Sequence, residues 1–250
     1  SNEEERKLKI IAPVKTAEYL HKFKEAGASE FYGGIFDERW HKEYGRFIEY
    51  NRRGSYIQKA NCTGWDELEK IVSMSMQYEV PFYLTVNALR ITESQRTILM
   101  EILKDFQRIG GERVIISDLS LLRPIINMGL KVTVSSCANI RNQYSVQLLK
   151  DAGCERIIFP RDLTLEEIVD IKSAVSDMEY EVFLMNSGCK FSDGNCLGLH
   201  GSENGALCDY CRKANPIFYR TDSDRLSEQE KTYLEEQNYI YNRLFRHACG

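Results

Sequence analysis

The sequence predicts an α/β fold of the TIM type, a (β/α) barrel that is incomplete at its C-terminal end. Short apolar segments alternate with amphipathic segments along the first 186 residues, which is the order of strands and helices in α/β proteins. The apolar segments are nearly continuous, as expected for strands that are covered on both faces. Seven such strands can be counted with no clear eighth, and an open doubly wound sheet is the alternative fold.

The predicted strands are short runs of apolar, β-forming residues that end at turn residues. They cover residues 8–13, 30–35, 80–87, 113–118, 131–136, 156–160 and 180–185. The helices between them are predicted after Thr16 and over residues 66–78, 93–108, 121–128 and 142–150, with a last helix after Thr164. Glu167 follows Thr164 by three residues, which is the capping-box pattern of a helix start.

Residues 36–61 form a long polar and aromatic insertion after the second strand. Aromatic rings beside arginines can stack on planar ligands or bases. The alternative that we favour is a solvated loop or a surface for a protein partner. Gly33-Gly34, just before the insertion, would let a ligand approach the backbone or would simply form a tight turn.

A cysteine-rich segment follows the last predicted strand, and it contains half of the chain's eight cysteines. Convergent thiolates in a loop suit zinc or an iron–sulfur cluster, and the alternative is buried cysteines or disulfides. A zinc ribbon usually repeats a CxxC unit, and only the last pair of these cysteines forms one. The six-residue gap between the first two cysteines also favours the cluster slightly, because a cluster is wider than a single ion. The candidate ligands are Cys189, Cys196, Cys208 and Cys211.

Polar residues follow the predicted strands at their C-terminal ends, which in parallel α/β folds face the side where substrates bind. Arg161 is the strongest of them, since an arginine can donate two parallel hydrogen bonds to a carboxylate or a phosphate. Asp118 has an equal alternative as a helix N-cap, and Asp162 also fits that role. The candidate catalytic residues are Asn87, Asp118, Ser135 and Arg161, with Tyr32, Ser136, Asp162, Asn186 and Cys189 at neighbouring strand ends.

Composition narrows the function classes. A net charge of −4 and a pI near 5.7 favour a small-molecule substrate over nucleic acid, without excluding a local basic patch.

No apolar run reaches the roughly 20 residues of a membrane-spanning helix, and the N-terminus has no signal peptide pattern, so we expect a cytoplasmic protein. None of the four histidines lies at a strand end and no protease motif is present, while Cys62, Cys137 and Cys154 look like packing residues.

The strand and cysteine segment resemble peptidase family U32, and the resemblance extends over nearly the whole chain. The segments that carry the resemblance are Glu181-Val182-Phe183, Cys189, Gly194-Asn195-Cys196, Gly205 to Cys208 and Cys211-Arg212, supported by Ile11-Ala12-Pro13, residues 27–34, Ile116-Ser117-Asp118 and residues 161–168. Two departures stand out. Met185-Asn186 replaces the frequent His-Gly pair of the family, and the last cysteine pair is CxxC where CxxxC is usual.

The resemblance implies a barrel-like core with an oxygen-sensitive 4Fe-4S cluster on cysteines of this segment. Cys189, Cys196 and one or both of Cys208 and Cys211 would be ligands, and Cys249 competes for the fourth place. Despite the peptidase label, several members resemble oxygen-independent hydroxylases of anaerobic metabolism. They act on ubiquinone precursors or on bases of tRNA and ribosomal RNA, with prephenate implicated as the oxygen source.

Three functions therefore remain open: an iron–sulfur hydroxylase, a peptidase as the family label says, and a structural metal-binding protein that acts through a partner. In the hydroxylase, a prephenate-like donor would be held beside the cluster. A partner would bind through residues 36–61 or the C-terminal tail. The predicted organisation is a barrel-like core over residues 1–186, a cluster-binding loop over 187–215 and a helical tail over 216–250 that stops before a last strand.

Overall fold

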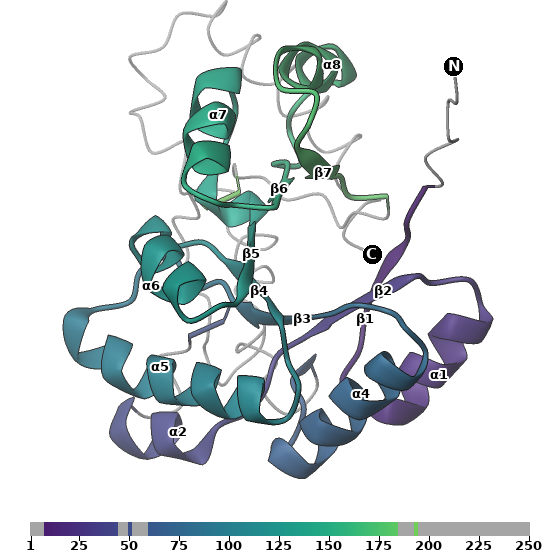
Figure 1. The fold of residues 1–250 in the computed structure, drawn as a ribbon, viewed down its shortest axis with the longest axis vertical. Helices are drawn as coiled ribbons and strands as arrows, with labels where there is room; N and C mark the ends of the chain where they lie inside the picture. The colour runs from purple at the N-terminus through teal and green to yellow at the C-terminus, as the bar shows by residue number, and fades with distance from the viewer. Residues whose placement is uncertain (1–7, 45–49, 52–59, 185–192, 195–250) are drawn as a thin grey trace, which may run out of the picture.

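The computed structural model describes residues 8–44, 50–51, 60–184 and 193–194. Seven parallel strands form one sheet in sequence order, and the sheet curls into part of a barrel with its helices on the outside (Figure 1). The predicted TIM-like fold is confirmed. The strands are β1 (Ile11–Pro13), β2 (Glu30–Gly33), β3 (Phe82–Val86), β4 (Arg113–Ile116), β5 (Lys131–Val134), β6 (Arg156–Ile158) and β7 (Glu179–Glu181).

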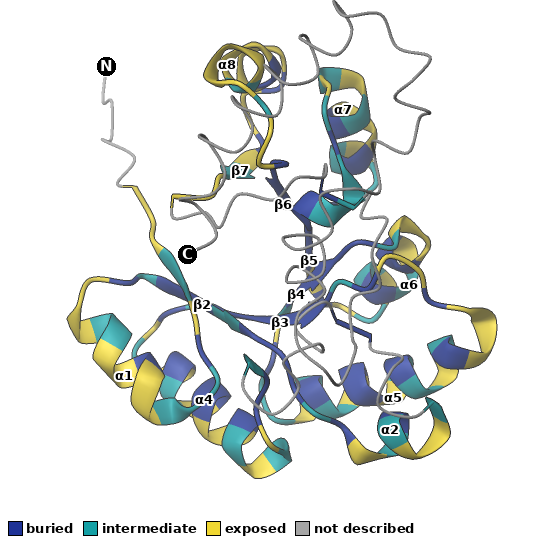
Figure 2. Ribbon diagram, turned by 180° about the vertical axis from the view of Figure 1, so that it is seen from behind, coloured by how far each residue is buried: buried dark blue, intermediate teal, exposed yellow. Residues whose placement is uncertain are grey.

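The helices follow the strands in the alternation that the sequence predicts, and they are buried on the side that faces the sheet (Figure 2). Two short 3-10 turns, Leu119–Leu121 and Ser136–Ala138, follow β4 and β5. The α-helices are α1 (Ala17–Glu25), α2 (Glu38–Tyr44), α4 (Trp65–Gln77), α5 (Glu93–Arg108), α6 (Leu122–Asn127), α7 (Gln143–Asp151) and α8 (Leu165–Ala174).

Polar caps start several of these helices at the predicted positions. The Thr16 side chain accepts a hydrogen bond from the backbone N–H of Tyr19 (3.3 Å) at the start of α1. At α8, Thr164 Oγ1 accepts from the Glu167 N–H (3.2 Å), and the Glu167 carboxylate accepts from the Thr164 N–H (2.8 Å). The predicted capping box is therefore present, because each side chain satisfies a backbone donor that the helix leaves open.

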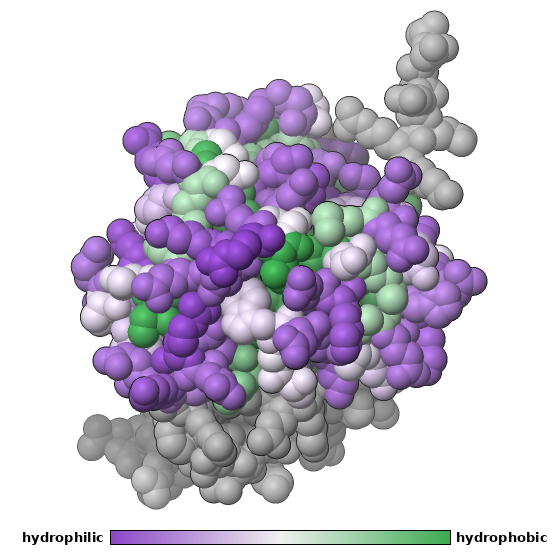
Figure 3. Space-filling model, turned by 60° about the horizontal axis from the view of Figure 1, so that its bottom comes forward, coloured by the Kyte–Doolittle hydropathy of each residue, from purple (hydrophilic) through white to green (hydrophobic). Residues whose placement is uncertain are grey.

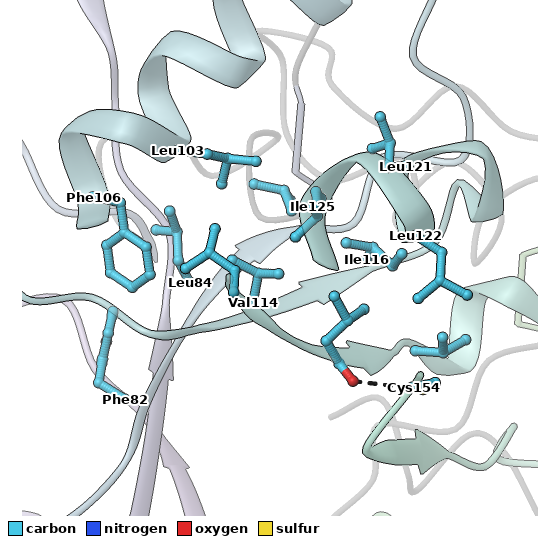
Figure 4. Close-up of a cluster of buried hydrophobic side chains, with 14 of the residues drawn as sticks. Phe82, Leu84, Leu103, Phe106, Val114, Ile116, Leu121, Leu122, Ile125 and Cys154 are labelled. Carbon is cyan, nitrogen blue, oxygen red and sulfur yellow. Dashed lines mark hydrogen bonds between the residues drawn. The ribbon is translucent and has the colours of Figure 1, made fainter. Parts of the chain in front are cut away.

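The main hydrophobic core lies between the outer face of the sheet and the helices. Figure 4 shows side chains of β3 and β4 packed against those of α5 and α6. Cys154 lies in this layer, where its thiol donates to the carbonyl oxygen of Arg156 (3.1 Å) and burial raises the thiol pKa to about 11. Cys154 and Cys62 are buried as expected for packing residues, whereas Cys137 is only half-buried.

A smaller apolar cluster fills the inner face of the curled sheet. It forms because side chains alternate between the two faces of a strand. Its members are Tyr83, Ile115 and Ile158, with Ile11 and Tyr32 packed against them. On the one face that Figure 3 shows, the described residues present mainly hydrophilic side chains with small apolar patches. Among the described residues, no helix is long and apolar enough to cross a membrane.

The structure corrects the prediction of a solvated loop for the described part of residues 36–61, while the alternative of a partner surface stays a prediction. The described part of this insertion contains α2, and Trp40 and Tyr50 are fully buried. The two rings pack edge to face with centroids 5.0 Å apart, and the Tyr50 hydroxyl donates to the carbonyl oxygen of Ile35. Burial of large aromatic surface stabilises this segment against the sheet, so the rings belong to the core.

The last strand is shorter than predicted. The apolar run 180–185 indicates a strand, but β7 ends at Glu181, and Val182, Phe183 and Leu184 have exposed side chains. In the described part of the chain β7 pairs with β6 alone. Among the described residues, β7 is therefore an edge strand with one hydrogen-bonded neighbour. A second neighbouring strand that could extend the pairing beyond Glu181 is absent from this part of the chain.

Candidate active site at the C-terminal ends of the strands

The predicted site residues Asn87 and Ser135 lie at the C-terminal edge of the sheet, just after β3 and β5. Ser117, just after β4, donates its hydroxyl to the carbonyl oxygen of Asn87 (3.0 Å). The buried Ser135 donates its backbone N–H to Ile116 (2.7 Å), and its hydroxyl oxygen accepts from the Cys137 N–H (3.3 Å). These bonds connect the ends of three neighbouring strands into one polar rim.

Asp118 is used as a cap at this rim. Its Oδ1 accepts from the backbone N–H of Ser120 (2.9 Å), and its Oδ2 accepts from the N–H of Ile91 (2.7 Å). Burial alone would raise the pKa of the Asp118 carboxyl, but these hydrogen bonds outweigh burial and lower the pKa below its usual range. The structure thus favours the cap alternative over a catalytic role. Asp162 is not a cap; it forms an ion pair with Arg141 (2.5 Å).

Arg161, just after β6, is held by a buried aspartate. Its backbone N–H donates to Asp193 Oδ2 (3.1 Å), and its guanidinium forms an ion pair with the same carboxylate. Asp193 is 7% exposed, and the guanidinium also lies 4.2 Å from the ring centroid of Phe183. The carboxylate that Arg161 binds in the structure is therefore supplied by Asp193 of this chain.

Gly194 completes the attachment of the same segment. Its φ is +82°, a left-handed conformation that glycine adopts without strain, and a Cβ at this position would collide with the carbonyl oxygen of Cys137. Asp193 and Gly194 thus contact both the residue after β6 and the 3-10 turn after β5. This described part of the predicted cluster-binding loop lies at the C-terminal rim, beside Ser135 and Arg161.

The predicted ligands themselves, Cys189, Cys196, Cys208, Cys211 and Cys249, lie outside the described residues, as does Asn186. Among the residues that are described, no group of three or more histidine, cysteine, aspartate or glutamate side chains is placed to hold a metal ion. The cluster and the zinc alternative therefore remain predictions.

Sequence reasoning did not single out three buried polar residues at this edge. The sequence signal at Asp193 is the turn-forming run Asp193-Gly194-Asn195, which indicates a loop and not a buried carboxylate. Asn61 and Thr85 gave no signal, because their pattern is that of an ordinary loop and an ordinary strand. Both lie beside Gly34 at the ends of β2 and β3.

A cavity of about 490 Å³ lies at the opposite, N-terminal end of the sheet. Its charged residues are paired with one another: Arg156 with Glu30 (2.6 Å) and Glu179 (2.7 Å), and Arg113 with Glu155 (2.9 Å). In TIM-type folds this end serves stability, while substrates bind at the C-terminal end. We therefore place the candidate active site at the rim of Asn87, Ser135 and Arg161.

The fold and the rim define an α/β protein of the TIM-barrel type with a polar C-terminal mouth. A solved structure with the same architecture is that of the U32 peptidase Mk0906, which aligns with a TM-score of 0.53 at 12% identity over 73% of this chain and 71% of that one. The sequence profile of peptidase family U32 matches residues 15–245. The chain belongs to this family.

Curated relatives include tRNA hydroxylation protein P of Escherichia coli K12, which is 31% identical over 137 residues, or 54% of this chain and 28% of that protein. The protein of the same name from Helicobacter pylori J99 is 24% identical over 76% of this chain and 42% of its own length. The 23S rRNA 5-hydroxycytidine C2501 synthase of Escherichia coli is 22% identical over 67% and 26% of the two chains. The matched region thus spans well under half of each relative.

Proposed function

We propose that this chain is the barrel part of an RNA base hydroxylase, with a base of tRNA or ribosomal RNA as substrate. The observation that carries the proposal is the similarity to proteins named for tRNA hydroxylation and for 5-hydroxycytidine synthesis. The polar rim at the strands' C-terminal ends supports it, since that is where a TIM-type fold binds its substrate.

This proposal revises the preference for a small-molecule substrate that the net charge of −4 suggested. The matched region makes up 26% to 42% of the relatives described above. The charge of one part does not set the electrostatic field of a whole protein, because the field sums over all charges. A small carboxylated molecule remains the proposed oxygen donor, as the family resemblance implies.

For the cofactor we propose a 4Fe-4S cluster on Cys189, Cys196 and one or both of Cys208 and Cys211, with Cys249 as the competing ligand. Thiolates are the ligands that such clusters prefer, and the donor set fits on that ground. When bound, a cluster supplies one-electron transfer, which would permit hydroxylation without molecular oxygen. Zinc on the same thiolates is the alternative.

The described residues support this proposal because they hold the cysteine segment against the rim of the candidate active site. Asp193 and Gly194 lie between two proposed ligands, Cys189 and Cys196, and they are attached to the rim. Arg161 is accordingly a positioning residue for the cysteine segment. Asn87 and Ser135 line the rim beside it, where their polar groups would orient the base or the donor.

The decisive experiment deletes the gene and measures the nucleosides of digested tRNA and ribosomal RNA by mass spectrometry. We expect a nucleoside that carries one added oxygen atom to disappear and to return with the wild-type gene. Cys196→Ala should not restore it and should lower the iron and sulfide content after anaerobic purification. The matched control is Cys154→Ala, which removes a buried thiol of the core and should keep both iron and activity.

Other outcomes would favour the alternatives. Unchanged nucleosides together with cleavage of a peptide panel would support the peptidase label. Near-stoichiometric zinc without iron, and unfolding of the Cys196→Ala variant, would support a structural metal site.

A further inference from the structure

A buried polar cradle surrounds Gly34 at the C-terminal end of β2. A Cβ on Gly34 would collide with Asn61 Oδ1 and would lie 2.9 Å from both Asn51 Nδ2 and Thr85 Oγ1. Three polar side chains from different parts of the chain therefore converge on one point, and the absence of a side chain at Gly34 lets them do so. A glycine in such a place often marks the close approach of another group.

Asn61 Oδ1 has no hydrogen-bond partner among the described residues, although Asn61 is only 1% exposed. Its Nδ2 donates to Asn51 Oδ1 (3.4 Å), so the amide is oriented with Oδ1 toward the cradle. Thr85 Oγ1 donates to the carbonyl oxygen of Gly33 (3.0 Å) and keeps lone pairs that can accept. An unsatisfied buried acceptor is costly, and its retention calls for an explanation.

The cradle lies where a substrate is expected. Thr85 is on the same face of β3 as Tyr83, which belongs to the inner apolar cluster of the curled sheet. Asn87, a residue of the candidate active-site rim, follows two positions later. The acceptors of the cradle are thus at the rim and on the inner side of the sheet.

We propose that this cradle binds the base that is hydroxylated, with Asn61 Oδ1 accepting a hydrogen bond from an N–H on the Watson–Crick edge of a pyrimidine. The inference rests on the proposed RNA hydroxylase function. Cytosine offers its exocyclic amino group and uracil its ring N3–H, and amide side chains commonly recognise such edges. Asn61 and Asn51 are nearly fully buried, so binding of a base requires a local conformational change that exposes them. We therefore expect slow association.

The test compares the full-length wild-type protein with Asn61→Leu, which keeps the shape of the side chain and removes its polar atoms. Calorimetry with cytidine and uridine monophosphates would show which pyrimidine binds, and 3-methyluridine monophosphate, which lacks the N3–H, tests the hydrogen bond from the ligand side. We expect Asn61→Leu to weaken binding of the preferred base at least about tenfold. The melting temperature should stay close to that of wild type, because the loss of the bond from Asn61 Nδ2 to Asn51 Oδ1 offsets the removal of an unsatisfied buried acceptor.

The matched control is Ser75→Ala. Ser75 is also buried and polar, but its hydroxyl donates to the carbonyl oxygen of Val80, before β3 and away from the cradle. This variant should melt at a lower temperature and bind the base normally. Equal binding by wild type and Asn61→Leu, or no binding of either pyrimidine by wild type, would overturn the inference.

The outcome is separable from that of the gene deletion. Loss of a hydroxylated nucleoside together with normal binding by Asn61→Leu would reject the cradle and leave the proposed function standing. Unchanged nucleosides together with Asn61-dependent binding would reject hydroxylation and leave a base-binding cradle.

Discussion

Arg161 and Asp193 show that the environment of a single residue decides between binding and positioning. A strand-end arginine is a good candidate for recognising an anionic substrate, and the sequence supports that interpretation. In the structure its guanidinium pairs with a buried carboxylate 32 positions later in the chain. Local sequence carries no signal for this pairing, because the two residues meet only when the segment after β7 returns to the end of β6.

The pairing can be tested by removing the charge of Asp193. We expect Asp193→Asn to lower the free energy of unfolding by about 1–2 kcal/mol, less than for a fully buried pair because Arg161 is partly exposed. Urea denaturation measures this change. The matched control is Asp162→Asn at the exposed Arg141 pair, which should cost less than about 1 kcal/mol. An equal loss in the two variants would contradict the role that we give to Asp193.

At the scale of elements, the insertion after β2 behaves as part of the core. Asp37 begins α2 by accepting backbone N–H bonds from Arg39 (2.9 Å) and Trp40 (3.2 Å), and its carboxylate also accepts from the Trp65 indole (2.9 Å). Burial tends to raise the pKa of Asp37, but bonds from Arg39 and Trp65 outweigh it and hold the pKa below its usual range. The polar composition of the insertion concealed a buried aromatic centre.

Truncation of Trp40 tests this assignment. Because Trp40 is fully buried, Trp40→Ala should destabilise the protein by about 3–5 kcal/mol, measured as a shift in the urea midpoint at constant slope. Tyr144 on α7 is 78% exposed, and Tyr144→Ala should change stability by less than about 0.5 kcal/mol. If Trp40→Ala were as stable as the control, the insertion would instead be a surface element.

Across the whole molecule, a charged network connects distant strands inside the curled sheet. Arg156 on β6 donates two hydrogen bonds to Glu30 on β2 (2.6 and 2.9 Å), and both residues are buried. Glu179 on β7 accepts from Arg156 (2.7 Å) and also from Lys9 (3.0 Å), which precedes β1. In the described residues, these side chains link the two edges of a sheet that has no backbone pairing between β1 and β7.

A double substitution would measure the contribution of this network. Arg156→Met should lower the free energy of unfolding by about 3 kcal/mol, since it leaves the buried Glu30 carboxylate with only Lys9, 3.6 Å away, as a cationic partner. Adding Glu30→Leu should recover most of the loss, because replacing both members of a buried ion pair with apolar groups is often nearly neutral. Chemical denaturation of the single and double variants measures these changes in the free energy of unfolding. A double variant less stable than Arg156→Met would show that Glu30 has another role.

By itself, the sequence determined the alternation of strands and helices, the capping box at Thr164 and which polar residues follow the strands at their C-terminal ends. These features depend on periodicity and on contacts within a few residues, so a linear pattern contains them. Tertiary structure alone decided that Asp118 also accepts from the N–H of Ile91, that Trp40 lies in the core and that Arg156 meets Glu30, 126 positions away. The physical reason is that such partners are chosen by the curvature of the sheet and by burial, which bring together residues whose separation in the chain carries no local signal.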